Sequence, residues 1–100
     1  MIPIEYHEEA QKIVLATLLN LSKKDSGVYQ SVTVLDRNIP RKGNSYFNIT
    51  CGDISSLLGD YISQDLVITI GIRQSTGGLS RGYLANLERI EELEKILGNS

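Results

Sequence analysis

Apolar residues recur at three- and four-residue spacing in three segments of the chain, and this spacing predicts three helices. The first begins near Pro3, which suits a first helical turn, and ends before Gly27, which suits a helix exit. The second follows Asp53 as its N-cap, and the third follows Ser80 as its N-cap and ends at Gly98. The three apolar stripes consist of Tyr6, Ala10, Ile13, Val14, Thr17, Leu18 and Leu21; of Ile54, Leu57, Leu58, Tyr61 and Ile62; and of Tyr83, Leu87, Ile90, Leu93 and Leu97.

Three other segments have the composition and alternation of strands. Residues 28–36 and 45–51 are predicted strands joined by a turn that contains Pro40 and Gly43. Residues 65–73 are predicted to form a buried strand. The side chains expected to face the core are Phe47, Ile49 and Cys51 on the second strand, and Leu66, Ile68, Ile70 and Ile72 on the third.

These elements predict one α+β domain over residues 1–100. Their order is αββαβα, or βαββαβα as in a ferredoxin-like fold if residues 2–6 form an additional first strand. The sheet is expected to be small and largely antiparallel, with helices at both chain ends. A hydrophobic content of 41% and a charged content of 22% are typical of a folded globular domain, so a packed core is expected.

The first predicted helix carries more apolar surface than one face can hold. Leu15 and Leu19 fall outside its stripe, so the helix is apolar on more than one side. A chain of 100 residues has little other surface with which to cover a second apolar side. We therefore expect a homo-oligomer.

The charge of the chain is small and uneven. The formal net charge is −2 and the isoelectric point is about 5.3, which makes long nucleic acid a poorer ligand than a compact one. The positive charge is concentrated in residues 37–81, where five arginines and lysines face three aspartates. No apolar run approaches the roughly 18 residues of a membrane span, and the first residues lack a signal-peptide pattern. We expect a cytoplasmic protein without a membrane partner.

The most informative stretch is RQSTGGLSRGY, residues 73–83, between the last predicted strand and the last predicted helix. Its two adjacent glycines allow backbone N–H groups to converge on an anion at a helix N-terminus, and its arginines suit forked contacts to phosphate oxygens. The glycine spacing matches neither the Walker nor the dinucleotide-binding pattern, and a plain connector remains the alternative. The candidate ligand-binding residues are Arg73, Ser75, Thr76, Gly77, Gly78, Ser80, Arg81 and Tyr83.

A second basic stretch, RKGNSYFNI, covers residues 41–49. It resembles the central signature of the RNA-recognition motif: Lys42 and Gly43 match its basic-glycine start, and Tyr46 falls on a position whose aromatic ring stacks on a base. Asn44 stands where that signature has another aromatic residue, and the partner motif of the first strand is missing. The resemblance implies an RNA-binding module that uses Lys42 and Tyr46 together with Arg37 and Arg41, whereas a solvated hairpin tip is the simpler interpretation.

The sequence offers no motif for catalysis, a metal or a cofactor. His7 and Cys51 are the only residues of their kinds, and they are too few for a typical structural zinc site. Cys51 is expected to be an inert core residue. The hypothesis is therefore non-catalytic binding of a small phosphate-bearing ligand, such as a nucleotide, at the glycine-rich loop. The alternatives are a homo-oligomeric structural or interaction protein without a small ligand, and the RNA-binding module.

Overall fold

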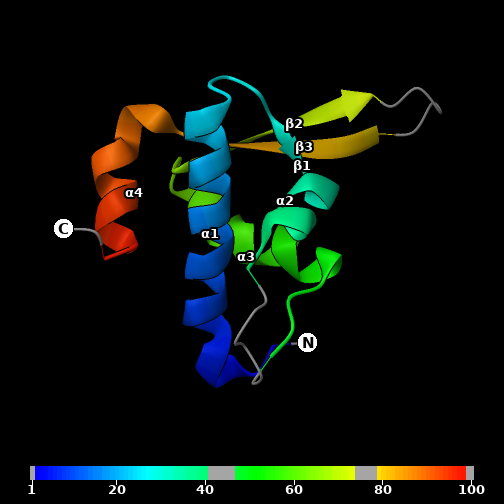
Figure 1. The fold of residues 1–100 in the computed structure, drawn as a ribbon, viewed down its shortest axis with the longest axis vertical. Coiled ribbons are helices and arrows are strands. Elements are labelled where there is room, and N and C mark those ends of the chain that lie inside the picture. The colour runs from blue at the N-terminus through cyan, green and yellow to red at the C-terminus, as the bar shows by residue number, and fades with distance from the viewer. Residues whose placement is uncertain (1, 41–46, 74–78, 99–100) are drawn as a thin grey trace.

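The computed structural model describes residues 2–40, 47–73 and 79–98 of the chain (Figure 1). Its elements are η1 (Ile4–Tyr6), α1 (His7–Lys24), β1 (Gln30–Ser31), α2 (Val32–Asn38), α3 (Cys51–Ser63), β2 (Val67–Arg73), β3 (Leu79–Ala85), η2 (Leu87–Arg89) and α4 (Ile90–Ile96). The three strands form one antiparallel sheet in the order β1-β3-β2. The predicted α+β class, the small antiparallel sheet and the helices towards both chain ends are confirmed. Within the described ranges, no helix combines the length and the apolar composition that a membrane crossing requires.

Helix α1 runs through the middle of the molecule, with α4 on one side and α2 and α3 on the other (Figure 1). Leu15 and Leu19, the two leucines outside the predicted stripe, are only 0% and 3% exposed. The prediction that they form an uncovered second apolar side is wrong, because elements of the same chain cover both sides of this helix. The second apolar side of α1 therefore gives no reason to expect a homo-oligomer.

The hairpin β2–β3 is the longest part of the sheet, with a register that runs from Val67 opposite Ala85 to Arg73 opposite Leu79. Val67, Tyr83 and Ala85 are buried on the face of the sheet that packs on the helices. Ile68 and Ile70 are 38% and 41% exposed. The prediction that these isoleucines face the core is therefore wrong, because the intervening residues are the ones turned inward.

In the part of the chain that the structure describes, the segments predicted as strands at 28–36 and 45–51 are mostly not strands. Only Gln30–Ser31 pairs with the sheet, after which the Ser31 side chain accepts a hydrogen bond from the Val34 N–H at 3.3 Å and caps α2. Residues 47–50 have no regular structure, and α3 begins at Cys51 because Thr50 is its N-cap. Cys51 is consequently exposed, and the prediction that it faces the core from a strand over residues 45–51 is wrong.

The predicted helix start at Ser80 is also wrong. Leu79–Ala85 forms β3, and the helical segment begins later, with η2 at Leu87 and α4 at Ile90. The physical reason is non-local: β3 completes its backbone hydrogen bonds with β2 and β1 on its two sides, so the strand is the central one of the sheet.

Candidate functional site

The residues of the predicted phosphate-binding stretch lie on the hairpin β2–β3. Arg73 ends β2, and Ser80, Arg81 and Tyr83 lie in β3. Ser75, Thr76, Gly77 and Gly78 lie outside the described residues. Because Ser80 lies in a strand and no helix begins there, no helix dipole attracts an anion at this position. The hairpin nevertheless brings the two arginines into neighbouring positions, since Gly71, the register partner of Arg81, is two residues from Arg73.

Arg81 is available to a ligand. Its side chain is exposed, and in the described part of the chain no carboxylate forms an ion pair with it. The residue opposite is Gly71, where a Cβ would have no heavy atom within 4 Å. The flank of Arg81 is therefore open, and its guanidinium can form the forked contact with phosphate oxygens that arginine favours.

Tyr83 connects the hairpin to α3. Its side chain is 1% exposed and its hydroxyl lies 3.2 Å from Ser55 Oγ in the first half of that helix. Tyr83 therefore supports the site from beneath and does not line an opening. Arg81 is two residues from Tyr83 along β3, so both side chains leave the strand on the face of the sheet where α3 lies. Arg81 and the beginning of α3 thus belong to one surface.

The exposed face of α3 was not predicted as part of a site. Between its apolar residues this helix exposes only small side chains or none over much of its length. These positions are Gly52, Ser55, Ser56, Gly59 and Ser63. Small residues let another backbone come close, and serine hydroxyls are common donors to phosphate oxygens. The signal was present in the sequence, but only the Tyr83–Ser55 contact shows that this face adjoins the arginine hairpin.

Both acidic residues of α3 are engaged within the fold. The Asp53 carboxylate accepts hydrogen bonds from the Thr50 backbone N–H at 3.0 Å and from Thr50 Oγ1 at 2.9 Å, while the Asp53 N–H donates to Thr50 Oγ1. The bond from the Thr50 N–H is the main reason that the pKa of Asp53 is lowered from its ordinary value of 3.8. Asp60 accepts a hydrogen bond from Gln11 of α1 at 2.9 Å, which turns its carboxylate towards that helix.

The arginine of the hairpin and the glutamates of α4 lie on opposite sides of α1 (Figure 1). Arg37, at the end of α2, is exposed, and the hairpin with Arg81 projects from the same side of α1 (Figure 1). Helix α4, which carries Glu91, Glu92 and Glu94, lies on the opposite side of α1 (Figure 1). The net negative charge of the chain therefore does not describe the surface around the hairpin.

The other candidates from the sequence lie partly outside the described residues or on different elements. Of the stretch that resembles an RNA-recognition signature, Arg41, Lys42 and Tyr46 lie outside the described residues, and residues 47–50 are not in a strand. His7 and Cys51 open different helices, and both are exposed. No group of three or more histidine, cysteine, aspartate or glutamate residues in the described ranges could hold a metal ion.

No family model matches the chain, and comparisons with curated proteins and solved structures returned no significant match.

Proposed function

We propose that this protein binds the phosphate backbone of a double-stranded nucleic acid with the hairpin β2–β3 and the exposed face of α3. The observation that carries the proposal is the position of Arg81: it is exposed on the sheet face that adjoins α3 through the contact of Tyr83 with Ser55. A duplex presents an extended array of phosphates, and its major groove, about 12 Å wide, admits an α-helix. A protruding basic hairpin, beside a helix whose exposed face carries small side chains, matches the charge and shape of such a ligand.

The order of elements supports the same function by analogy. Helices α1, α2 and α3 followed by an antiparallel hairpin, with β1 before α2 and a sheet ordered β1-β3-β2, resemble a winged helix-turn-helix domain. In helix-turn-helix proteins the second helix of the pair enters the major groove, and α3 occupies that position here. The hairpin would contact the backbone beside it.

The chain departs from that arrangement in two ways. The connection between α2 and α3 covers residues 39–50, whereas a helix-turn-helix has a turn of about 3–4 residues. The exposed face of α3 also has no arginine or lysine to read base edges. The proposed binding therefore depends mainly on phosphate contacts and has little sequence preference.

Fluorescence anisotropy with a labelled mixed-sequence DNA duplex of roughly 20 bp, about two helical turns, tests the proposal over a range of salt concentrations. Arg81→Ala should weaken binding about ten- to hundredfold, because a charge-assisted contact contributes about 1.5–3 kcal/mol. It should also reduce the slope of log K against log salt by about 0.9 for each phosphate that the arginine no longer neutralises. Lys95→Ala removes the same charge from exposed Lys95 on α4 and should leave binding unchanged. A wild-type protein that does not bind the duplex at low salt would refute the proposal.

A compact phosphate-bearing ligand, such as a nucleotide, is the second candidate at the same hairpin. Its support is the register, in which Arg81 pairs with Gly71, two residues from Arg73, so that two arginines can share one phosphate group. Calorimetry with mono-, di- and cyclic nucleotides separates the two candidates. Nucleotide binding that is abolished in Arg81→Ala, together with no binding of the duplex, would favour the compact ligand.

A further inference from the structure

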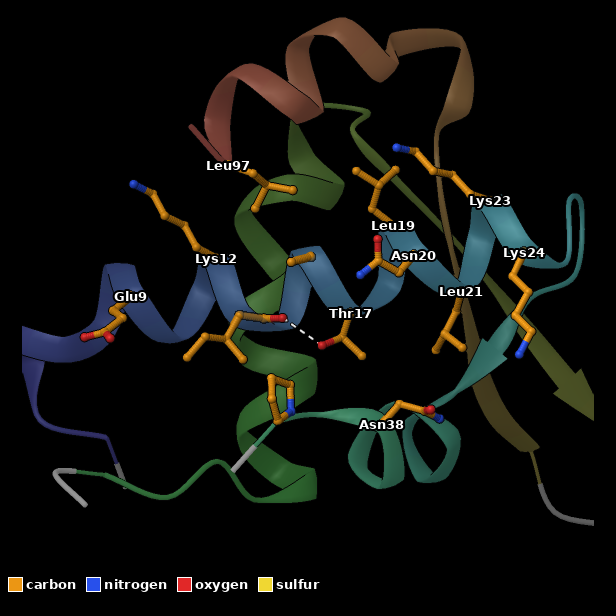
Figure 2. A pocket seen from close by; sticks show the side chains of 13 residues that line it. Glu9, Lys12, Thr17, Leu19, Asn20, Leu21, Lys23, Lys24, Asn38 and Leu97 are labelled. Atoms are coloured by element: carbon orange, nitrogen blue, oxygen red, sulfur yellow. Dashed lines mark hydrogen bonds between the residues drawn. The ribbon is translucent and has the colours of Figure 1, made fainter. Parts of the chain in front are cut away.

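A groove with a volume of about 710 Å³ runs along α1 (Figure 2). Most of its lining comes from α1, and Leu97 after α4 and Asn38 at the end of α2 lie on opposite sides of that helix (Figure 2). Pro40, just beyond α2, also lines the groove. Ile13 and Ala16 line the groove and are half-buried in the single chain. Part of this apolar surface therefore remains for a partner to cover.

The two ends of this groove differ in charge: the end at Glu9 also holds Lys12, which is paired with Glu8 of its own helix at 3.6 Å, and the other end is positive. Glu9 lies at the beginning of α1, and Lys23 and Lys24 lie in its last turn (Figure 2). Residues 9, 13, 16, 20 and 23 all line the groove and alternate in spacings of four and three, so they form one stripe along the helix. Ala16 is the midpoint of this stripe, because Glu9 and Lys23 are each seven residues away.

We propose that a second copy of this protein docks in the groove, with the two α1 helices antiparallel about a twofold axis at Ala16. Glu9 of each copy then faces Lys23 and Lys24 of the other, so one pattern provides two equivalent sets of ion pairs. The small side chain of Ala16 lets the helices approach at the axis. Ile13 of each copy is then covered by the other copy. A parallel arrangement would place Glu9 against Glu9, so the charges select the antiparallel one.

The pair Glu9 and Lys24 is the most informative for a test. Lys23 already contacts Glu94 of its own chain at 3.9 Å, whereas no ion pair of Glu9 or Lys24 is found within the described part of the chain. Both side chains are exposed. A change in either charge therefore removes no intrachain ion pair identified there, and an effect on assembly can be assigned to contact between copies.

Sedimentation velocity over micromolar to near-millimolar concentrations should show a monomer–dimer equilibrium for the wild type. Glu9→Lys and Lys24→Glu should each raise the dimer dissociation constant at least about tenfold, because symmetry turns two ion pairs into two like-charge contacts. The double variant Glu9→Lys/Lys24→Glu restores opposite charges between positions 9 and 24, while position 23 remains a lysine, so its dissociation constant should lie between those of the single variants and that of the wild type. Glu88→Lys makes the same charge change at an exposed residue outside the groove and should have no effect.

Ala16→Arg provides a second test, because two arginines at the twofold axis leave no room for the helices to meet. It should be monomeric at every concentration while its circular dichroism spectrum stays that of the wild type. The proposal would be overturned by a wild type that is monomeric at every concentration. It would also be overturned if the dissociation constant of the dimer did not change in these variants, or if the double variant dissociated as readily as the single ones. Duplex binding by a monomer would remain possible in each case, so the two proposals fail independently.

Discussion

Cys51 is an accessible thiol beside the proposed nucleic-acid surface. It is the first residue of α3 and is exposed, and the exposed small residues of that helix begin at the next position, Gly52. Its reactivity towards added reagents therefore depends on access from solvent and not on unfolding of the core.

Native maleimide labelling of Cys51, followed by mass spectrometry, is expected to be nearly as fast as labelling of the unfolded chain. If the duplex lies along α3, a saturating concentration of duplex should slow this labelling at least about fivefold at low salt and have little effect at high salt, which weakens binding to the phosphate backbone. Cys51→Ser should still bind the duplex, since the sulfur has no proposed contact. Slow labelling of the free native protein would argue against an exposed thiol.

Helix α3 begins with a reciprocal capping box between Thr50 and Asp53. The contact matters for the proposed site because it fixes where the helix starts, and so which residues are presented beside the hairpin. The pKa of Asp53 is lowered mainly by the hydrogen bond from the Thr50 N–H. A lowered folded-state pKa means that the ionised carboxylate stabilises the fold above its ordinary pKa of 3.8, and that this stabilisation disappears as the pH falls through the lower folded value.

Asp53→Asn should therefore lower the free energy of unfolding near neutral pH by about 0.3–1 kcal/mol, the usual contribution of a negative charge in the first turn of a helix. As the pH falls through the lowered pKa of Asp53, the wild-type carboxylate is itself protonated, so the difference between the two proteins should shrink. Urea denaturation followed by circular dichroism at several pH values measures it. A difference that stays constant across this range would show that the charge of Asp53 contributes nothing to the cap.

The core of the molecule is complete within a single chain around α1. Leu15 is fully buried, and so are Val14 and Leu18 of the predicted stripe. Assembly of two copies through the groove therefore adds to a folded unit that already covers its main helix. Charged elements are also arranged around α1: the basic hairpin and the acidic α4 lie on opposite sides of that helix (Figure 1).

Leu15→Ala should lower the free energy of unfolding by about 2–5 kcal/mol, the cost of a cavity in a packed core. The folded fraction should keep the mass of the wild-type species, because this leucine belongs to the fold and not to a contact between copies. Ile68→Ala shortens an exposed side chain of β2 and should cost much less. Denaturant titration and light scattering on the same samples measure both quantities. A normal stability with a reduced mass would place Leu15 in an interface instead.

Local sequence signals determined the α+β class, the main helix and the existence of α3, although the predicted N-cap of α3 was Asp53 and the structure places Thr50 there. The apolar stripes that contain Val14 and Leu18, or Ile54 and Leu58, continue at helical spacing beyond one turn. No strand pattern competes with them. The two arginines of the candidate site were also identifiable from the sequence, because a basic, glycine-rich stretch is a local pattern. Their relation to α3 was not, since it depends on the contact of Tyr83 with Ser55, which lies 28 residues away.

Tertiary structure decided the segments that carry two patterns at once. Residues 79–97 combine Tyr83, Leu87 and Ile90 at helical spacing with Tyr83 and Ala85 at strand spacing. Pairing with β2 and β1 selects the strand up to Ala85, because the central position of a sheet uses hydrogen bonds that no local pattern reveals. The same holds for β2, where alternation defines two faces but only packing against the helices determines that Val67 is buried and Ile68 and Ile70 are exposed.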